Sequence, residues 1–273
     1  MAIYKSIFNI YISSAMNILD LELKNVKRLL LPNLENVFEK CNTVLSIQPH
    51  PDDTDIAAGG TIAKLAKNRC QVVYVTVTDG GAGTTARNLS WESVASIRRR
   101  EQESAAKILG VSELIWLNYR DSKLEPTMEL RSRLITLIRR FKPDVVLTVD
   151  PWLRYEAHPD HRSTGIAVSE AFLLSGFPNV NHIDLVNGLE PHSPKFIAYY
   201  WSEKPNIYVD ITEWIDIKFK AIIEHKSQLS DEMVSLLKAV FRLMGEKAGY
   251  EFAEAFKVLT SSALHCNVYA SEL

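Results

Sequence analysis

The chain has 273 residues and a mass of 30.9 kDa, and 47% of its residues are hydrophobic, which is ample for a large core. Its 31 basic and 33 acidic residues are mixed along the chain and leave a formal net charge of −2, so no basic stripe indicates a nucleic-acid partner. No run approaches the roughly 18 apolar residues that a membrane span requires, and the three cysteines lack C-x-x-C spacing. We therefore expect a cytoplasmic protein with free thiols and a small substrate, without a nucleic-acid or membrane partner.

Strands and helices alternate along the middle of the chain. Residues 1–40 have amphipathic, helical spacing, and apolar runs at 43–47, 71–78, 113–117 and 144–149 then predict buried strands. Helical patterns lie between these strands, and one of them runs from Ser90, a good N-cap, to Leu109 before Gly110. Such alternation predicts an α/β fold in which helices flank a mostly parallel sheet.

The second half of the chain is less regular. A proline-rich stretch at 178–194 predicts a long loop, and two short strands follow at 196–201 and 207–209. We expect a helix from Ile211 to about Gln228 and further helix up to Phe256. The chain is interpreted as one domain with three parts: an N-terminal helical flank (1–40), a core (41–210), and C-terminal helices with a tail (211–273).

Two clusters of histidine and aspartate follow two of the predicted strands. His50-Pro51-Asp52-Asp53 comes directly after the strand at 43–47, and His158-Pro159-Asp160-His161 comes after the strand at 144–149. Ligands bind beyond the carboxyl ends of parallel strands, so both clusters are expected to meet at one point, most simply a metal ion.

These residue types suit a catalytic zinc site. Zinc accepts imidazole nitrogen and carboxylate oxygen, and catalytic sites use about three protein ligands and leave a position open. His50 and Asp53 are spaced to face one point, and His161 at a helix start can supply a third ligand. Either cluster alone would also fit capping and turn residues, and spacing alone does not decide which aspartate reaches the metal.

The motifs, in their order along the chain, carry a resemblance to a known family. His50-Pro51-Asp52-Asp53 with Gly59-Gly60-Thr61, then Thr78-Asp79-Gly80, and then His158-Pro159-Asp160-His161 resemble the zinc-dependent N-acetylglucosaminyl deacetylases (PIG-L/LmbE-like). The similarity runs from about residue 43 to 228. Asn118-Tyr119-Arg120-Asp121, Asp150-Pro151-Trp152 and Gly245-Glu246-Lys247 are most similar to the archaeal diacetylchitobiose deacetylases within that family.

The resemblance implies a fold, a reaction and a set of roles. It implies a Rossmann-like sheet and removal of the N-acetyl group from a small amino sugar such as diacetylchitobiose or N-acetylglucosamine. It implies one zinc ion per chain held by His50, Asp53 and His161. Asp52 is implied as the general base, His158 as the group that stabilises the oxyanion, and Asp160 as the group that orients His158.

The resemblance also implies substrate contacts, which the residues alone indicate less clearly. Arg98 and Asp121 match sugar-contacting positions; a helix face explains Arg98 equally well, and without the resemblance a strand-end loop is the favoured explanation of Asp121. Trp152 is an aromatic residue that can stack on a sugar ring or pack in the core. His265 matches a histidine that lies near the neighbouring subunit's site in the archaeal branch, which implies a homo-oligomer; a packed tail residue is the simpler interpretation.

Three other functions compete with this interpretation. The first is an amidase or deacetylase of the same family that acts on a thiol-conjugated glucosamine derivative. The second is a two-metal phosphoesterase, which would need more bridging carboxylates than the two motifs provide. The third is a catalytically dead sugar-binding module, which would have no reason to retain Asp52 and His158 beside the ligands.

Overall fold

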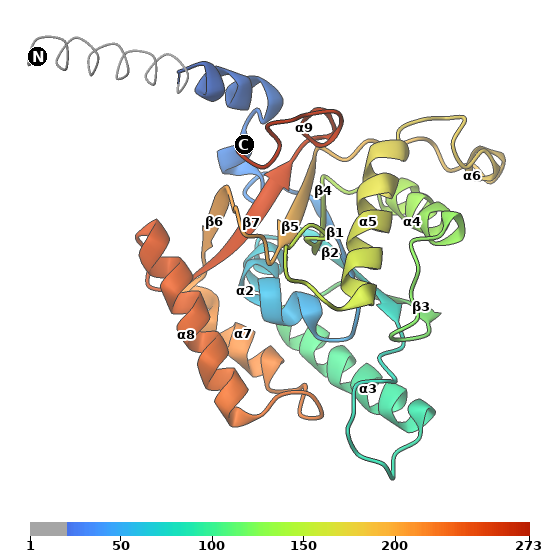
Figure 1. Cartoon of the computed structure of the whole chain (residues 1–273), viewed down its shortest axis with the longest axis vertical. Coiled ribbons are helices and arrows are strands. Elements are labelled where there is room, and N and C mark those ends of the chain that lie inside the picture. Colours follow the sequence, from blue (N-terminus) through green and yellow to red (C-terminus); the bar gives the residue numbers. More distant parts are fainter. Residues whose placement is uncertain (1–20) are drawn as a thin grey trace, which may run out of the picture.

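A seven-stranded sheet of order β3-β2-β1-β4-β5-β7-β6 forms the centre of the computed structural model, which describes residues 21–273 (Figure 1). The strands are β1 (Thr43–Gln48), β2 (Gln71–Thr78), β3 (Glu113–Tyr119), β4 (Val145–Val149), β5 (Phe196–Tyr200), β6 (Ile207–Asp210) and β7 (Ala253–Leu259). The helices are α2 (Asp53–Lys67), α3 (Trp91–Leu109), α4 (Met128–Phe141), α5 (Pro159–Leu174), α6 (Ile183–Val186), α7 (Ile215–Ile222), α8 (Asp231–Ala248) and α9 (Ser261–Leu264).

The order in which the chain adds strands to the sheet changes direction between β1 and β4, which are neighbours in the sheet. Strands β1 to β5 are all parallel, and the chain moves outward from β1 to β2 and β3 before it returns to place β4 on the other side of β1. Such a reversal leaves a crevice at the carboxyl ends of the two central strands, where ligands bind in sheets of this kind. The fold class predicted from the sequence, a Rossmann-like and mostly parallel sheet, is confirmed.

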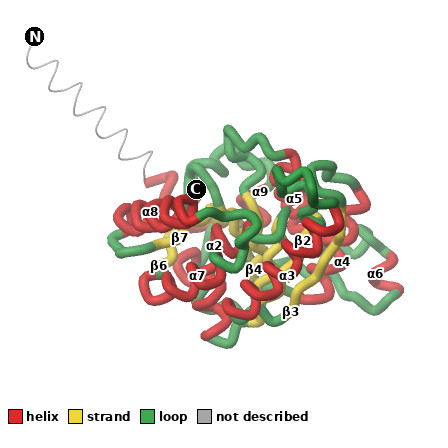
Figure 2. Tube along the Cα trace, turned by 90° about the horizontal axis from the view of Figure 1, so that it is seen from below, coloured by secondary structure: helices red, strands yellow, loops and turns green. Residues whose placement is uncertain are grey.

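Helices cover both faces of the sheet, as right-handed crossovers require. Helices α2, α3 and α7 contact one another, and α4 and α5 lie side by side as a separate pair (Figure 1). Figure 2 shows the strands running through the middle of the molecule with helices around them. Strands β4 and β5 are buried along their whole length, which explains why they have continuous apolar sequences instead of alternating ones.

Local signals set several of the helix boundaries. Helix α3 begins after Ser90, whose side chain accepts a hydrogen bond from the backbone N–H of Ser93, and it ends at Gly110, with φ of 80°. Helix α5 begins at Pro159, a residue suited to the first helical position because it has no N–H to satisfy. These boundaries place both histidine–aspartate clusters at junctions between a strand and a helix.

The C-terminal part differs from the sequence-based prediction. A helix was expected to continue to Phe256, but α8 ends at Ala248 and is followed by β7, which pairs antiparallel with both β5 and β6. The expected helix from Ile211 to Gln228 is also too long, since a 3-10 turn and the short helix α7 occupy only Thr212–Ile222. The strand was missed because buried Glu254, paired with buried Lys218, interrupts its apolar pattern.

The N-terminal flank is described only in part. Residues 21–30 are helical, as expected, whereas the first part of the predicted flank, residues 1–20, lies outside the described residues. Within residues 21–273 one contiguous hydrophobic core connects the sheet with its helices. None of the described helices is both long enough and apolar enough to cross a membrane.

Candidate active site

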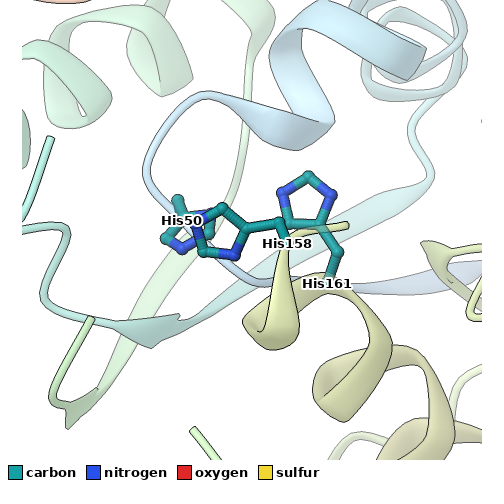
Figure 3. A group of neighbouring side chains, drawn as sticks. All are labelled: His50, His158 and His161. Carbon is teal, nitrogen blue, oxygen red and sulfur yellow. The ribbon is translucent and has the colours of Figure 1, made fainter. Parts of the chain in front are cut away.

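The two histidine–aspartate clusters meet at the carboxyl ends of β1 and β4. His50 lies in the loop between β1 and α2, and His158 and His161 lie at the start of α5. Figure 3 shows the three imidazole rings gathered at one point, with His158 and His161 projecting from α5 toward His50. Ring nitrogens of these three side chains come within 4.8 Å of one another, which makes them a group able to hold a metal ion.

Asp53 lies between two of these rings. One carboxylate oxygen is 3.3 Å from Nδ1 of His50, and the other is 3.3 Å from Nε2 of His161. Two ligand atoms at about 2.1 Å from one tetrahedral zinc ion would lie about 3.4 Å apart, so these separations suit ligands of a shared ion. His158 is also near enough to reach such an ion, so geometry alone leaves more than one ligand set.

The outward-facing nitrogens of the two rings are paired with carboxylates. Nε2 of His50 lies 3.2 Å from Asp160 and 3.3 Å from Asp121, and Nδ1 of His161 lies 3.0 Å from Glu156. Histidine ligands of metal ions usually donate their second N–H to a carboxylate, which fixes the tautomer and the orientation of the ring. This arrangement therefore leaves the inward nitrogens of His50 and His161 free to bind a metal.

The charge of the site favours a bound cation. Burial lowers the pKa of His50, but its contacts with Asp121, Asp160 and Asp53 outweigh burial and hold that pKa well above its ordinary value. Burial raises the pKa of Asp53, but the facing His161 and His50 lower it well below the ordinary range. Positive charge is thus stabilised between these side chains, whether a proton or a metal ion supplies it.

Asp52 has a different environment from its neighbour. It is the N-cap residue of α2, but its side chain makes no capping hydrogen bond. One of its oxygens instead accepts a hydrogen bond of 3.1 Å from the guanidinium of Arg98. Burial raises the pKa of Asp52 in spite of Arg98, which lowers it. Asp52 is therefore a buried carboxylate with an oxygen available beside the metal group.

His158 has a defined tautomer. Its Nδ1 accepts a hydrogen bond of 3.2 Å from the backbone N–H of Asp160, so the proton of the neutral ring belongs on Nε2. Burial, together with His50 and His161, lowers the pKa of His158, which favours that neutral form. Its Nε2–H can therefore act as a hydrogen-bond donor in the site.

A cavity of about 270 Å³ opens beside Asp52 and His158. Its lining comprises His50, Asp52, Ala82, Gly83, Arg98, Asp121, Ser122, His158 and Gln228. Arg98 and Asp121, predicted to contact substrate, both belong to this lining, but each is already held by the protein. Arg98 donates to the carbonyls of Gly80 and Pro51 as well as to Asp52, and Asp121 is only 3% exposed.

Two of the predicted substrate residues do not line this cavity. Trp152 is 56% exposed and lines a separate cavity of about 550 Å³, where its ring packs edge-on against Tyr199. His265 is exposed and follows α9. Because β7 runs antiparallel to β5, it leads to α9 at the amino ends of the parallel strands, whereas the active site lies at their carboxyl ends. Neither residue touches the site within a single chain.

Asp160 is placed differently from its expected role. Its carboxylate was expected to orient His158, but its oxygens accept from His50 and from the backbone N–H groups of Ser122 and Leu124. Only the backbone N–H of Asp160 reaches His158. The carboxylate of Asp160 therefore orients His50, whereas its backbone N–H orients His158.

Glu156 is a site residue that the sequence reasoning missed. One carboxylate oxygen contacts His161, and the other accepts a hydrogen bond of 2.7 Å from the backbone N–H of His158. Its position two residues before His158 was the available signal, because a carboxylate there can cap the loop that leads into α5. Glu156 thus connects the two histidines of the second cluster.

These residues form a set suited to the hydrolysis of an amide. Asp52 offers a proton acceptor, His158 offers a hydrogen-bond donor, and His50, Asp53 and His161 offer nitrogen and oxygen ligands to a metal. In metallohydrolases, acid–base groups of this kind beside a metal with an open position activate a water molecule that attacks the carbonyl carbon.

The chain is similar to known deacetylases along most of its length. Residues 45–172 match the family described as PIG-L, GlcNAc-PI de-N-acetylase. Diacetylchitobiose deacetylase from Thermococcus kodakarensis is 39% identical over 237 residues, which cover 85% of this chain and 89% of that protein. A probable N-acetyl-alpha-D-glucosaminyl L-malate deacetylase 2 from Bacillus anthracis is 30% identical over 205 residues, 71% of this chain and 84% of that protein.

A solved structure agrees with these relatives. The structure of N,N'-diacetylchitobiose deacetylase from Pyrococcus horikoshii, complexed with its inhibitor MPG, matches with a TM-score of 0.86 and 41% sequence identity. The match covers 92% of this chain and 97% of that one. The similarity therefore extends well beyond the two motifs and beyond residues 45–172.

Proposed function

Because the chain belongs to the PIG-L family of de-N-acetylases, we propose that it removes the acetyl group from the 2-acetamido nitrogen of an N-acetylglucosamine-type sugar such as diacetylchitobiose. One observation carries the proposal: the adjacent aspartates Asp52 and Asp53 have separate environments. Asp53 lies between His50 and His161, whereas Asp52 lies beside Arg98 at the cavity of about 270 Å³. Amide hydrolysis by a metal-activated water uses both a metal ligand and a proton acceptor beside the metal.

We assign one zinc ion to His50, Asp53 and His161. The donor set of two imidazoles and one carboxylate, without a thiolate, is typical of catalytic zinc. The carboxylates behind His50 and His161 support the same assignment, since they direct the inward nitrogens to one point. When bound, zinc would polarise the amide carbonyl and lower the pKa of water toward about 7.

Asp52 acts as the general base in this proposal. Its buried carboxylate accepts a proton from the attacking water, and its raised pKa brings its basicity closer to neutral pH. Arg98, 3.1 Å away, keeps one oxygen fixed, so that the other can face the water. The same carboxylic acid can then return the proton to the departing amine.

His158 stabilises the developing oxyanion. Its Nδ1 is occupied by the backbone N–H of Asp160, so its Nε2–H is the donor directed toward the reacting carbonyl. The lowered pKa of His158, caused by burial and the two neighbouring histidines, favours the neutral ring that carries its proton on Nε2.

The sugar occupies the cavity of about 270 Å³. Arg98 and Asp121 contact its hydroxyls from the cavity wall, and both also hold catalytic residues in place. Trp152 and His265 contribute only if a longer substrate or a second copy of the chain reaches them.

Exposed apolar residues Met233, Leu236 and Leu243 on α8 support self-association, which light scattering would test.

We also infer a cytoplasmic location, supported by three free cysteines.

The experiment that tests the proposed reaction is amine release from a panel of acetylated sugars. Diacetylchitobiose, N-acetylglucosamine and a thiol-conjugated glucosamine derivative would be compared at equal concentration, with Asp52→Asn protein as the blank. Preference for the thiol conjugate would favour the alternative amidase, and release from none of them would leave a sugar-binding protein.

A further inference from the structure

The backbone of Asp52 has a conformation that few residues other than glycine adopt. Its φ is 119° and its ψ is −31°, at the junction between the loop after β1 and helix α2. Residues whose backbone is held in such a conformation depend on surrounding contacts, and such conformations are concentrated at functional sites. The contacts that hold this backbone therefore also determine where the carboxylate of Asp52 points.

Helix α3 holds the Asp52 loop through two side chains one turn apart. Arg98 donates to the carbonyl of Pro51 at 2.9 Å and to the carboxylate of Asp52 at 3.1 Å. Oε1 of Gln102 accepts a hydrogen bond of 2.9 Å from the backbone N–H of Asp52, and Gln102 is completely buried. Arg98 thus fixes the carboxylate, and Gln102 fixes the peptide that carries it.

Gln102 is itself held in one orientation. The backbone N–H of Asp52 can only donate, so the atom of Gln102 that faces it must be the amide oxygen. That oxygen also accepts from Gln48, at 2.8 Å, while Nε2 of Gln102 donates to Asp55 at 2.7 Å. Every bond of this amide is inside the protein, and a rotated amide would lose its bond to Asp52.

The chain of hydrogen bonds ends at a buried histidine. Asp55 is fully buried and accepts from Gln102, from the hydroxyl of Tyr74 at 3.0 Å and from Nε2 of His225 at 2.8 Å. His225 comes from the turn after α7, 170 residues from Asp55 along the chain. Its Nδ1 is buried and has no hydrogen-bond partner among residues 21–273, so Asp55 is the only hydrogen-bond partner of its ring there.

We propose that Gln102 is a positioning residue for the general base, held in turn by the Asp55–His225 pair. Gln102 keeps the peptide of Asp52 in its unusual conformation, so that the carboxylate stays between Arg98 and the reacting water. The inference rests on the proposed function, since it takes Asp52 as the base. It predicts that Gln102 affects the chemical step and not the metal site or substrate affinity.

The test uses the zinc-loaded full chain with Gln102→Met, which keeps a similar length but removes all three hydrogen bonds. Because a small displacement of a catalytic group can cost up to about a hundred-fold in rate, kcat should fall about ten- to hundred-fold. KM and the zinc content should stay within about two-fold of the wild type. Gln102→Asn, which keeps an amide too short to reach both Asp52 and Asp55, serves if the methionine variant does not fold.

A second arm separates positioning from general destabilisation. Tyr199→Phe removes one buried hydrogen bond of 2.7 Å, to Ser169, outside the site, so it should lower the thermal midpoint with little change in kcat. If Gln102 acts through Asp52, adding Gln102→Met to Asp52→Asn should cause no further loss of rate.

Three results would overturn the proposal. They are an unchanged kcat in both Gln102 variants, loss of zinc with the loss of activity, and a full additional loss of rate in the double variant. Failure of the proposed function itself would be visible separately, as absence of deacetylation by the wild-type protein.

Discussion

The two adjacent aspartates give the sharpest prediction, because a metal ligand and a base fail differently when they become amides. In Asp53→Asn, the backbone N–H of His50, 2.8 Å from the carboxylate, would keep the remaining amide oxygen. The NH₂ group would then face Nε2 of His161, where an anionic oxygen now lies at 3.3 Å. Metal affinity should fall ten-fold or more, and added zinc should restore part of the activity.

Asp52→Asn should have the opposite behaviour. Arg98 would keep the amide oxygen at the place of the carboxylate oxygen that it now contacts at 3.1 Å, which turns the NH₂ group toward the water. An amide accepts no proton at neutral pH, so kcat should fall by about 10²–10⁴, equivalent to roughly 3–5 kcal/mol of transition-state stabilisation. KM and zinc content should change little, since no ligand is removed.

The assay pairs metal analysis of the purified variants with amine release at several zinc concentrations. Wild-type protein provides the reference for zinc content, and Tyr199→Phe provides a control for the loss of a buried hydrogen bond elsewhere. Loss of the metal in Asp52→Asn together with its retention in Asp53→Asn would contradict this assignment, because the roles of the two carboxylates would then be exchanged.

Three further predictions test other parts of the site and the fold. Glu156→Gln should weaken zinc binding about 10- to 100-fold, measured by competition with a chelator, because it removes the anionic partner of His161; unchanged affinity would exclude that role. At saturating zinc, Arg98→Ala and Asp121→Ala should each lower kcat/KM about ten-fold or more, whereas wild-type kinetics in both would remove them from the site. Burial lowers the pKa of Lys257 from 10.5 to about 8, so the charged form of Lys257 destabilises the folded protein. The free energy of unfolding of the wild type, measured in denaturant, should therefore rise between about pH 8 and 10.5 relative to that of Lys257→Met. A difference between the two proteins that stays constant with pH would contradict this.

The central part of the site was predictable because its signals are local. His50 comes directly after β1, the second cluster begins helix α5 beyond the loop that follows β4, and strand ends in a parallel sheet share one edge. The convergence of His50 and His161 therefore follows from the positions of β1 and β4 alone. The separate environments of Asp52 and Asp53 do not, since they depend on Arg98 and His161, which are far away along the chain.

The remaining parts depend on contacts that no local pattern encodes. His225 has no neighbouring partner in the sequence, and only the fold shows that it is buried against Asp55, 170 residues away. Strand β7 was hidden for a similar reason, because its buried Glu254 is neutralised by Lys218 from a separate helix. Pairs of buried charged or polar residues satisfy each other only after folding, so a hydrophobic pattern read along one segment misplaces them.

The most direct test of the account is a zinc titration of metal-free protein, followed by amine release from diacetylchitobiose. We expect negligible activity after removal of metal, and a linear rise with added zinc that stops at one equivalent per chain. That result would agree with a single ion at His50, Asp53 and His161. Full activity in metal-free protein, or a plateau only at two equivalents, would contradict the single-zinc site on which the mechanism depends.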